Sequence, residues 1–207
     1  MIAPLRAAGW LEQCPADWQA ATHHPFLDGV RDGSLDPAAF GRWLVQDHRF
    51  VDDLLRAQAH LLAQAPRADQ AVLIGGLAVL EAELGWFETH AARLGLGLGA
   101  ARHAVTQRYQ QALGTLQSPP YLFGITALWT LERAYLEAWQ GAAPGAPAYA
   151  EFVAHWTVPA FADYVAGLER AVDAALAGAS ADEQVQAGAI FRGIAHLEAA
   201  FWGTATT

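Results

Sequence analysis

Hydrophobic residues recur at steps of three and four along most of the chain, a spacing that places them on one face of an α-helix. Strand patterns are nearly absent: few hydrophobic and polar positions alternate, and no Asn-Gly or Asp-Gly turn lies between two apolar runs. The pattern predicts an all-α helical bundle. Helices are expected near residues 6–21, 36–64, 68–94, 101–115, 119–140, 147–177 and 182–203, and a break at Pro159 would raise their number from seven to eight.

Turn signals separate these predicted helices. Glycine, proline, serine and other turn-forming residues gather at positions 31–34, 95–99, 117–120, 141–147 and 178–180. Asp36-Pro37 is a favourable helix start, because Asp can cap the first free N–H groups and Pro suits the first helical position. No long linker or internal repeat interrupts the 207 residues, so the sequence predicts one domain over 1–207.

Four of the predicted helices each carry one carboxylate inside the hydrophobic stripe. In the stretch TALWTLERAYLEAW, residues 126–139, Glu132 lies on the same face as Trp129 and Leu136. An unpaired buried carboxylate is costly, so each acid needs a hydrogen bond, a cation, a proton or a polar cavity. A bond to Arg or to the backbone remains open for any single acid, but four together, flanked by aromatic residues, predict a shared acidic pocket. The four acids are Asp47, Glu83, Glu132 and Glu198.

Composition narrows both the partners and the chemistry. The net charge of −9 and the pI near 5.2 argue against nucleic acid or an anionic membrane as partner, because both need a basic face. All twelve basic residues are Arg, and without Lys a Schiff base or an ordinary P-loop is excluded. Cys14 is the only cysteine, which excludes an internal disulfide and a Cys-based metal site. Eight Trp, nine Phe and five Tyr are more rings than packing requires, as is typical of a small-molecule pocket.

The chain shows no targeting signal. Its first ten residues, MIAPLRAAGW, lack the apolar core of a signal peptide, and no apolar run reaches the ~18 residues of a membrane span. A cytoplasmic location without membrane contact is therefore expected.

Two chemistries use an acidic pocket in a helical bundle. A di-metal site of the ferritin type needs Glu-x-x-His pairs, and the sequence has none, although His24, His155 or His196 could join a less regular site. Metal-free acid-base catalysis needs one carboxyl group whose pKa is raised by apolar surroundings and a second that stays ionised. Glu132 and Glu198 suit this division, because both have bulky apolar neighbours. We therefore predict a site without metal or cofactor.

Other residues suit the recognition of a flat ring. A carboxylate binds an amino-heteroaromatic ring through its exocyclic amine and an adjacent ring nitrogen, a paired contact that suits Asp47. Aromatic side chains can hold such a ring by stacking, and the candidates are Phe50, Trp86, Trp156 and Phe201. The substrate expected from these residues is small, flat and either cationic or amine-bearing.

Four segments carry a resemblance to a known family. They are HPFLDGVRDGSLDPAAFGRWLVQDHRFV (24–51), GGLAVLEAELGWF (75–87), TALWTLERAYLEAW (126–139) and HLEAAFWG (196–203). In this order and spacing they resemble the TenA family, also called thiaminase II, over nearly the whole chain. The resemblance implies a haem-oxygenase-like all-α bundle. One branch of that family carries a Cys nucleophile in a Pro-Cys pair; the matching region here reads WTLERAY, so the chain resembles the branch with Glu instead.

The resemblance also implies a reaction. The Glu-type branch acts in thiamin salvage, removing the formyl group and then the amine from formylaminomethyl- or aminomethyl-pyrimidine to give hydroxymethylpyrimidine. Cleavage of intact thiamin is associated with the Cys type. Glu132 lies one place from the position of the missing thiol, so we expect it to take part in the reaction, and Glu198 matches the proposed proton donor of the family. We expect Glu132 to activate water while Glu198 protonates the departing nitrogen, although the reverse assignment is open.

Substrate contacts follow from the same comparison. Asp47 matches the Asp that anchors the pyrimidine, and Phe50 and Phe201 match aromatic residues that pack on the ring. Tyr109 and Tyr135 match tyrosines that border the pocket, and Trp156 stands where the Cys type has a Tyr. Glu83, one of the four acids on the hydrophobic stripes, and Trp86, one of the stacking candidates, complete the set. The predicted substrate-binding residues are Asp47, Phe50, Glu83, Trp86, Tyr109, Tyr135, Trp156 and Phe201.

Other functions remain open on the same scaffold. They are a different hydrolase or lyase, a metal-dependent oxygenase or cofactor-free oxidase, and a regulatory binding module, because a fold by itself does not define an activity. Members of the family are usually dimers or tetramers. The resemblance therefore implies a homodimer or homotetramer with a small aminopyrimidine as its ligand.

Overall fold

The computed structural model describes residues 5–205, and every regular element in that range is a helix. The all-α prediction is confirmed, but there are ten α-helices in this range instead of seven or eight. The elements are α1 (Ala7–Gln13), α2 (Pro15–Thr22), α3 (Pro25–Asp32), α4 (Pro37–Gln64), α5 (Gln70–Leu94), α6 (Ala104–Ala112), η1 (Leu113–Gln117), α7 (Tyr121–Ala142), α8 (Ala150–Trp156), α9 (Pro159–Ala177), α10 (Ala181–Phe201) and η2 (Trp202–Ala205), where η marks a 3₁₀ helix.

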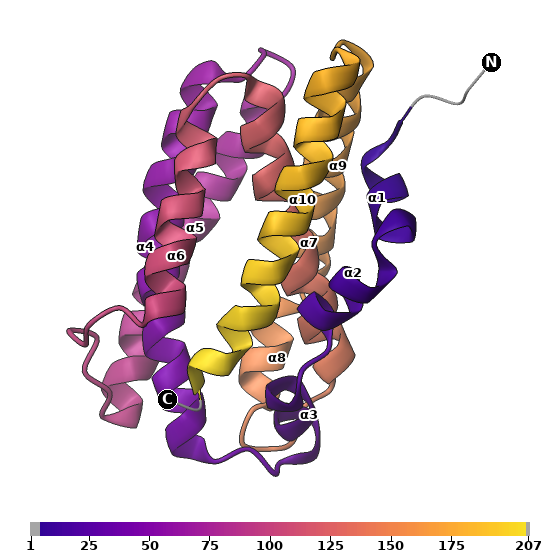
Figure 1. Cartoon of the computed structure of the whole chain (residues 1–207). Helices are drawn as coiled ribbons and strands as arrows, with labels where there is room; N and C mark the ends of the chain where they lie inside the picture. Colours follow the sequence, from indigo (N-terminus) through magenta and orange to yellow (C-terminus); the bar gives the residue numbers. More distant parts are fainter. Residues whose placement is uncertain (1–4, 206–207) are drawn as a thin grey trace.

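The long helices lie roughly side by side along the long axis of the molecule (Figure 1). On one side α4 packs against α5 and α6, and on the other α7 packs against α9 and α10. The short helices α1 to α3 run along the outer edge of the second side (Figure 1). This arrangement brings together the inner faces of α4, α5, α7 and α10, each of which carries one of the four predicted inward-facing acids.

The sequence of α7 explains why this helix is central. Apolar residues cover nearly all of its faces, a pattern typical of a buried helix. Trp129 and Trp139 are fully buried, and Glu132 lies among such residues with only 7% exposure. Burying a Trp side chain contributes roughly 4 to 6 kcal/mol to the free energy of folding. The hydrophobic stripe predicted around Glu132 is therefore confirmed.

Prolines account for most differences from the predicted helix boundaries. The predicted helix 6–21 is two helices, because Pro15 has no N–H to continue α1 and instead starts α2. Pro159 likewise starts α9, so the break predicted at this residue is confirmed. The predicted segment 101–115 differs for another reason, since it tightens to a 3₁₀ helix from Leu113.

Helix α3 has no counterpart among the predicted helices. Its signals lie at its ends: the His24 side chain accepts a hydrogen bond from the Phe26 N–H at 3.1 Å, and Pro25 takes the first helical position. Gly33, with φ at 84°, ends the helix in the left-handed conformation that glycine adopts without strain. Eight residues are too few for hydrophobic periodicity to reveal such a helix.

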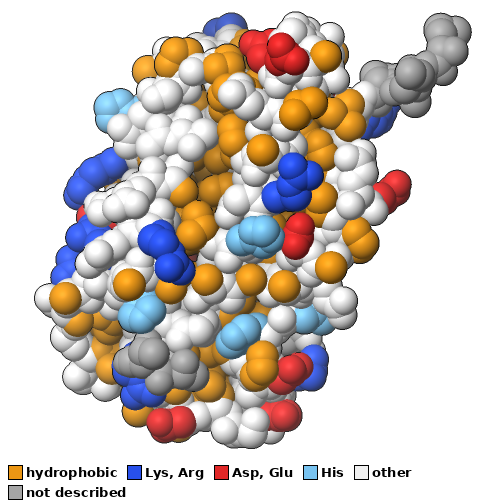
Figure 2. All heavy atoms as spheres, viewed as in Figure 1, with side chains coloured by type: hydrophobic (Ala, Val, Ile, Leu, Met, Phe, Trp, Pro, Cys, Tyr) orange, Lys and Arg blue, Asp and Glu red, His pale blue; other side chains and the backbone are white. Residues whose placement is uncertain are grey.

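Helix α5 is apolar yet reaches the surface. By length and composition alone it could cross a membrane, with a mean hydropathy of 1.3 over a stretch that is only 22% buried. That is weak evidence, because ordinary core helices pass the same test, and α5 packs against α4 and brings Glu83 to the interior. Exposed apolar residues include Ile74 and Val79 on this helix. Figure 2 shows hydrophobic side chains over much of one face of the molecule, with charged groups set among them, as is usual for protein surfaces.

Candidate active site

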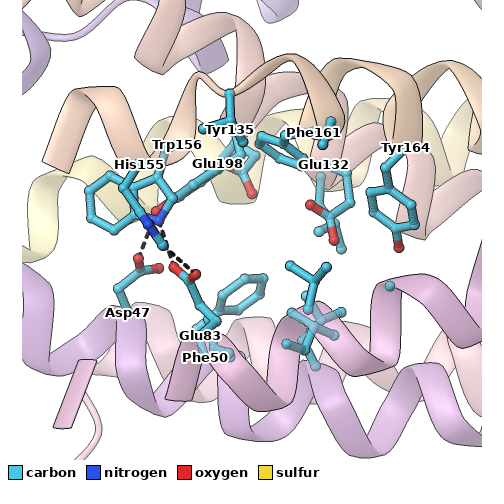
Figure 3. A pocket seen from close by; sticks show the side chains of 18 residues that line it. Asp47, Phe50, Glu83, Glu132, Tyr135, His155, Trp156, Phe161, Tyr164 and Glu198 are labelled. Atoms are coloured by element: carbon cyan, nitrogen blue, oxygen red, sulfur yellow. Dashed lines mark hydrogen bonds and ion pairs between the residues drawn. The ribbon is translucent and has the colours of Figure 1, made fainter. Parts of the chain in front are cut away.

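A pocket of about 390 Å³ lies between the inner faces of the long helices (Figure 3). The structure brings all four predicted inward-facing acids into its lining. The remaining wall is mainly aliphatic and aromatic, as in most pockets that bind small organic molecules. The polar or partly polar side chains of the lining are Asp47, Glu83, Glu132, Tyr135, His155, Trp156, Tyr164 and Glu198.

The register of the helices sets the order of groups along the pocket. α4 contributes Asp47 and, about two turns later, Leu54, while α5 returns antiparallel and contributes Glu83 and, about two turns earlier, Gly76. The pocket therefore has a carboxylate end at Asp47 and Glu83 and an apolar end at Leu54 and Gly76, roughly 10 Å apart along α4. Figure 3 shows Glu132 of α7 between the carboxylate end and Tyr164, whose hydroxyl lies beside Gly76.

Asp47, at the carboxylate end, is 1% exposed and has one free oxygen. Its Oδ2 accepts a hydrogen bond from the Tyr135 hydroxyl at 2.9 Å, while Oδ1 is buried without a partner in residues 5–205. Burial raises the pKa of Asp47 well above its usual range; the Tyr135 bond opposes this, and neighbouring carboxylates reinforce it. A buried acceptor without a partner costs about 1–3 kcal/mol, so this oxygen is ready to receive a donor from a ligand.

Glu198 of α10 is held from behind by Tyr109. The Tyr109 hydroxyl donates a hydrogen bond to the Glu198 carboxyl group, and both side chains are buried. Burial raises the pKa of Glu198 to about 8, although the bond from Tyr109 lowers it in part. Glu198 can therefore hold or release a proton near neutral pH. Tyr109 is outside the pocket lining and its hydroxyl is bound to Glu198, so the structure places it as a support for Glu198, and its contact with a substrate stays a prediction.

Glu132 faces the same space and is the least supported of the acids. No hydrogen bond between the described residues reaches its carboxyl group, which is only 7% exposed. Burial raises the pKa of Glu132 to about 8, and the charges of Glu198 and Glu83 act in the same direction. Its oxygens are therefore available to a water molecule or a ligand in the pocket.

Glu83 differs because both of its oxygens have partners. Oε2 lies 2.6 Å from His155 Nε2, and Oε1 accepts a hydrogen bond from Trp156 Nε1 at 2.6 Å. Both partners belong to α8, so this carboxylate ties α5 to α8 at the pocket wall (Figure 3). The sequence suggests Glu83 as a substrate contact, whereas in the structure its oxygens are engaged by the protein.

Two of the aromatic residues expected to stack on the ring lie behind the pocket wall. Trp86 stacks on His155 with ring centroids 4.0 Å apart and an angle of 4° between the planes, and Phe201 packs against Phe50 at 5.6 Å. Neither Trp86 nor Phe201 is among the lining residues. Each packs on a lining residue, Trp86 on His155 and Phe201 on Phe50, and their stacking on a ligand stays a prediction.

The lining also contains residues that sequence reasoning missed. Phe50, Tyr135 and Trp156 line the pocket at the expected place, but Phe161 and Tyr164 of α9 complete the wall. Their spacing of one helical turn indicates a shared face, yet the same spacing is typical of ordinary core residues. No charged residue marks this face of α9 as part of a site, so the signal in the sequence was weak.

The three histidines considered as metal ligands have other partners. His24 caps α3, and His155 and His196 each pair with a carboxylate, at 2.6 and 3.0 Å. Within residues 5–205, no group of three or more His, Cys, Asp or Glu is arranged to hold a metal ion. Cys14 lies between α1 and α2, away from the pocket lining.

Fold and site together define the class: an all-α bundle that encloses an acid-lined pocket of the size of a small organic ligand. The chain belongs to the TENA/THI-4/PQQC family, whose model matches residues 12–207. The resemblance to TenA proteins is thus confirmed, and the activity class is that of a small-molecule enzyme.

Individual relatives cover nearly the whole chain. It is 30% identical over 205 residues to a probable bifunctional TENA-E protein from Glycine max, spanning 93% of this chain and 90% of the relative. It is 27% identical over 211 residues to an aminopyrimidine aminohydrolase from Halalkalibacterium halodurans, spanning 96% and 94%. A solved TenA homologue from Pyrococcus furiosus superposes with a TM-score of 0.91 at 27% identity, covering 96% of this chain and 98% of the other.

Proposed function

We propose that this protein is a thiamin-salvage hydrolase of the Glu-type TenA branch, converting formylaminomethyl- or aminomethyl-pyrimidine to hydroxymethylpyrimidine. The observation that carries the proposal is a pocket lined by Asp47, whose buried Oδ1 has no partner in residues 5–205, and by two further acids with raised pKa values. The relative that is named an aminopyrimidine aminohydrolase and the TENA-E name of the Glycine max relative support it.

Asp47 suits the recognition of an aminopyrimidine. Oδ1 can accept a hydrogen bond from the exocyclic amine, and Oδ2, already bound by Tyr135, retains a site for the adjacent ring nitrogen. Phe50 and Trp156 offer ring faces at the same end of the pocket. The nitrogen of a neutral ring is an acceptor, so the pair needs one proton between Oδ2 and the ring, and the raised pKa of Asp47 favours keeping that proton there.

Glu132 and Glu198 suit the two proton transfers of hydrolysis. Two buried acids with pKa values near 8 are both mostly protonated at neutral pH, so neither is the permanently ionised partner expected from the sequence. The base is the fraction of protein in which one of them has lost its proton, and that charge disfavours ionisation of the other. We assign Glu132, which has no donor from the protein, as the base that takes a proton from water. The water oxygen bonds to the formyl carbon or, in the second reaction, to the pyrimidine methylene carbon. The C–N bond breaks, and Glu198 supplies the proton to the departing nitrogen.

The direct test uses the purified protein with both pyrimidine compounds. We expect formate from the formyl compound and ammonia from the aminomethyl compound, with hydroxymethylpyrimidine as the final product. Thiamin should remain intact, because Cys14 lies outside the pocket lining. If neither formate nor ammonia is released, the proposed function is wrong. The oxidase and regulatory alternatives are not favoured, because a relative that covers nearly the whole chain is named a hydrolase of aminopyrimidines.

We also propose that the protein is a cytoplasmic homodimer or homotetramer that binds neither nucleic acid nor membranes. Exposed apolar side chains such as Ile74, Val79 and Val185, which are 55%, 63% and 73% exposed, would gain from burial between subunits. Light scattering on the eluting peak of a gel-filtration column measures the mass, and a monomer at micromolar concentration would contradict this proposal.

A further inference from the structure

The pocket is larger than the formyl compound requires. A cavity of roughly 150 Å³ holds one benzene ring, whereas this pocket measures about 390 Å³. A pyrimidine at the carboxylate end would use the space of one ring, its small substituents would use some more, and a formyl group adds only one carbon and one oxygen. Space comparable to a second small ring therefore remains in the pocket, and the part of the lining farthest from Asp47 is the apolar end.

The walls of the apolar end are hydrophobic and built from three helices. Leu54 of α4 is 2% exposed, and α9 contributes Phe161 and, one turn further along, Tyr164 to the same lining. The polar atom there is the Tyr164 hydroxyl, which donates to Gln58 Oε1 at 3.3 Å. Its proton is therefore already in use, and this end offers an incoming group mainly apolar contact.

The close approach of α5 to Tyr164 depends on glycine at position 76. A Cβ added to Gly76 would lie 2.5 Å from Tyr164 Oη, closer than real side-chain contacts allow. Its absence lets α5 approach the Tyr164–Gln58 pair, which holds the Tyr164 ring at the wall of the apolar end.

Charge restricts what can occupy this space. Four carboxyl groups and His155 line the pocket, and no Arg is among the lining residues in the described range. A phosphate or carboxylate on the substrate would lie near Glu132 without a cation to pair with it, which is costly in an apolar setting. The favoured group is therefore uncharged and apolar.

The order of the groups shows where such a substituent would attach. Figure 3 shows Glu198, Glu132 and Tyr164 in this order away from Asp47. With the ring on Asp47, the bond that breaks would lie near Glu198 and Glu132, and the substituent on the departing nitrogen would extend past Glu132 toward Tyr164. We propose that the site hydrolyses N-acyl aminomethyl-pyrimidines whose acyl group is larger than formyl, such as butanoyl or benzoyl. This inference rests on the proposed function and names a broader substrate class for the same site.

The reaction is an ordinary amide hydrolysis. Water, after giving a proton to Glu132, bonds through its oxygen to the amide carbonyl carbon. The C–N bond breaks and Glu198 gives its proton to the nitrogen, leaving a carboxylic acid and aminomethylpyrimidine. The acyl chain stays in contact with Leu54 and Phe161 throughout, so its contacts act on binding of both the substrate and the transition state.

The test measures kcat and KM for the N-formyl, N-acetyl, N-butanoyl and N-benzoyl compounds on the same protein preparation. Each methylene buried at the apolar end should lower KM about fourfold, so the butanoyl compound should bind more tightly than the acetyl compound. We expect kcat/KM for the butanoyl compound to equal or exceed that for the formyl compound.

A variant that narrows the pocket on the way to the apolar end locates the effect. Ala160 is exposed at the start of α9 and lines the pocket one turn before Tyr164, so Ala160→Phe should fold and reduce the space that leads toward Tyr164. The ratio of kcat/KM for butanoyl to that for formyl should fall at least tenfold. Val79→Phe, on α5, gives a second variant of the same kind. Ala174→Phe, at an exposed position of α9 outside the lining, is the matched control and should leave the ratio unchanged.

Three outcomes separate the possible failures. The inference would be overturned if the formyl compound is hydrolysed but kcat/KM for the butanoyl and benzoyl compounds is more than a hundredfold lower. That result would leave the proposed function intact. A ratio that is the same in Ala160→Phe, Val79→Phe and the wild type would overturn the placement of the acyl group at the apolar end. Absence of turnover with every compound, the aminomethyl compound included, would overturn the proposed function itself.

Discussion

Glu83 and Glu132 each lie within a hydrophobic stripe of a helix, yet they differ in the hydrogen bonds that their carboxyl groups accept. Both oxygens of Glu83 are bound, one by His155 and one by Trp156, each at 2.6 Å. Glu132 accepts no hydrogen bond from the residues of 5–205, and burial raises its pKa to about 8. A carboxylate that is fully hydrogen-bonded fixes the wall of the pocket, whereas one that is desolvated and unbound is suited to exchange protons with a substrate.

Replacing each glutamate by glutamine tests this difference most strongly. Glu132→Gln keeps the shape but cannot take a proton, so kcat on the formyl compound should fall roughly 10²- to 10⁴-fold. Glu83→Gln should lower kcat less than tenfold but reduce the free energy of unfolding by about 1–3 kcal/mol, because a bond to His155 or Trp156 is lost. Steady-state kinetics and urea unfolding of both variants provide the measurement. Full activity in Glu132→Gln would remove this residue from the mechanism.

The dependence of stability on pH tests the raised pKa values of Glu132 and Glu198. The pKa of Glu132 and of Glu198 is raised from 4.5 in the unfolded chain to about 8 in the folded protein. Between pH 4.5 and 8 the unfolded chain loses these protons while the folded protein keeps them, so the free energy of unfolding falls as pH rises through this window. Below it, both states are protonated and the contribution is constant.

Urea unfolding of the wild type and Glu132→Gln from pH 5 to 8 measures this effect. The free energy of unfolding of the variant should fall less steeply with pH than that of the wild type. Over this pH range the two decreases should differ by on the order of a few kcal/mol. Parallel curves would show that Glu132 has an ordinary pKa in the folded protein.

Asp47 is intermediate between the two glutamates, since one oxygen is bound and the other is free. Asp47→Asn removes the charge-assisted contact with the ring, so KM should rise about ten- to a hundredfold with a smaller change in kcat. Tyr135→Phe is the matched control, because it removes only the bond to Oδ2. An unchanged KM in Asp47→Asn would contradict the anchoring role of this residue.

Two neighbouring glycines of α5, the helix that carries Glu83, test how closely this helix packs against Tyr164. Gly76→Ala places a methyl group 2.5 Å from Tyr164 Oη and should lower the free energy of unfolding by about 1–3 kcal/mol. Gly75→Ala meets nothing within 4 Å and should be neutral or stabilise α5 by roughly 0.5–1 kcal/mol. Thermal unfolding compares them, and equal melting temperatures would show that the Tyr164–Gln58 pair adapts freely.

Much of the fold follows from local patterns in the sequence. Periodicity identified the long helices, because a buried stripe repeats with the helical turn over many residues. The Asp36 carboxylate caps α4 through the Ala38 N–H at 3.1 Å, as the Asp-Pro pair predicted. The eight-residue helix α3 was not predicted, because two helical turns are too short for a period of buried positions to be recognised.

The sequence by itself determined that four helices each turn one acid toward the core, because helical spacing decides the face on which a side chain lies. Only the tertiary structure decided which of those acids would be satisfied. Glu83 meets His155 across 72 positions of the chain, and Glu198 meets Tyr109 across 89, whereas none of residues 5–205 donates a hydrogen bond to Glu132. The physical reason is that periodicity is a local property, while the partner of a buried carboxyl group depends on how distant helices pack against one another.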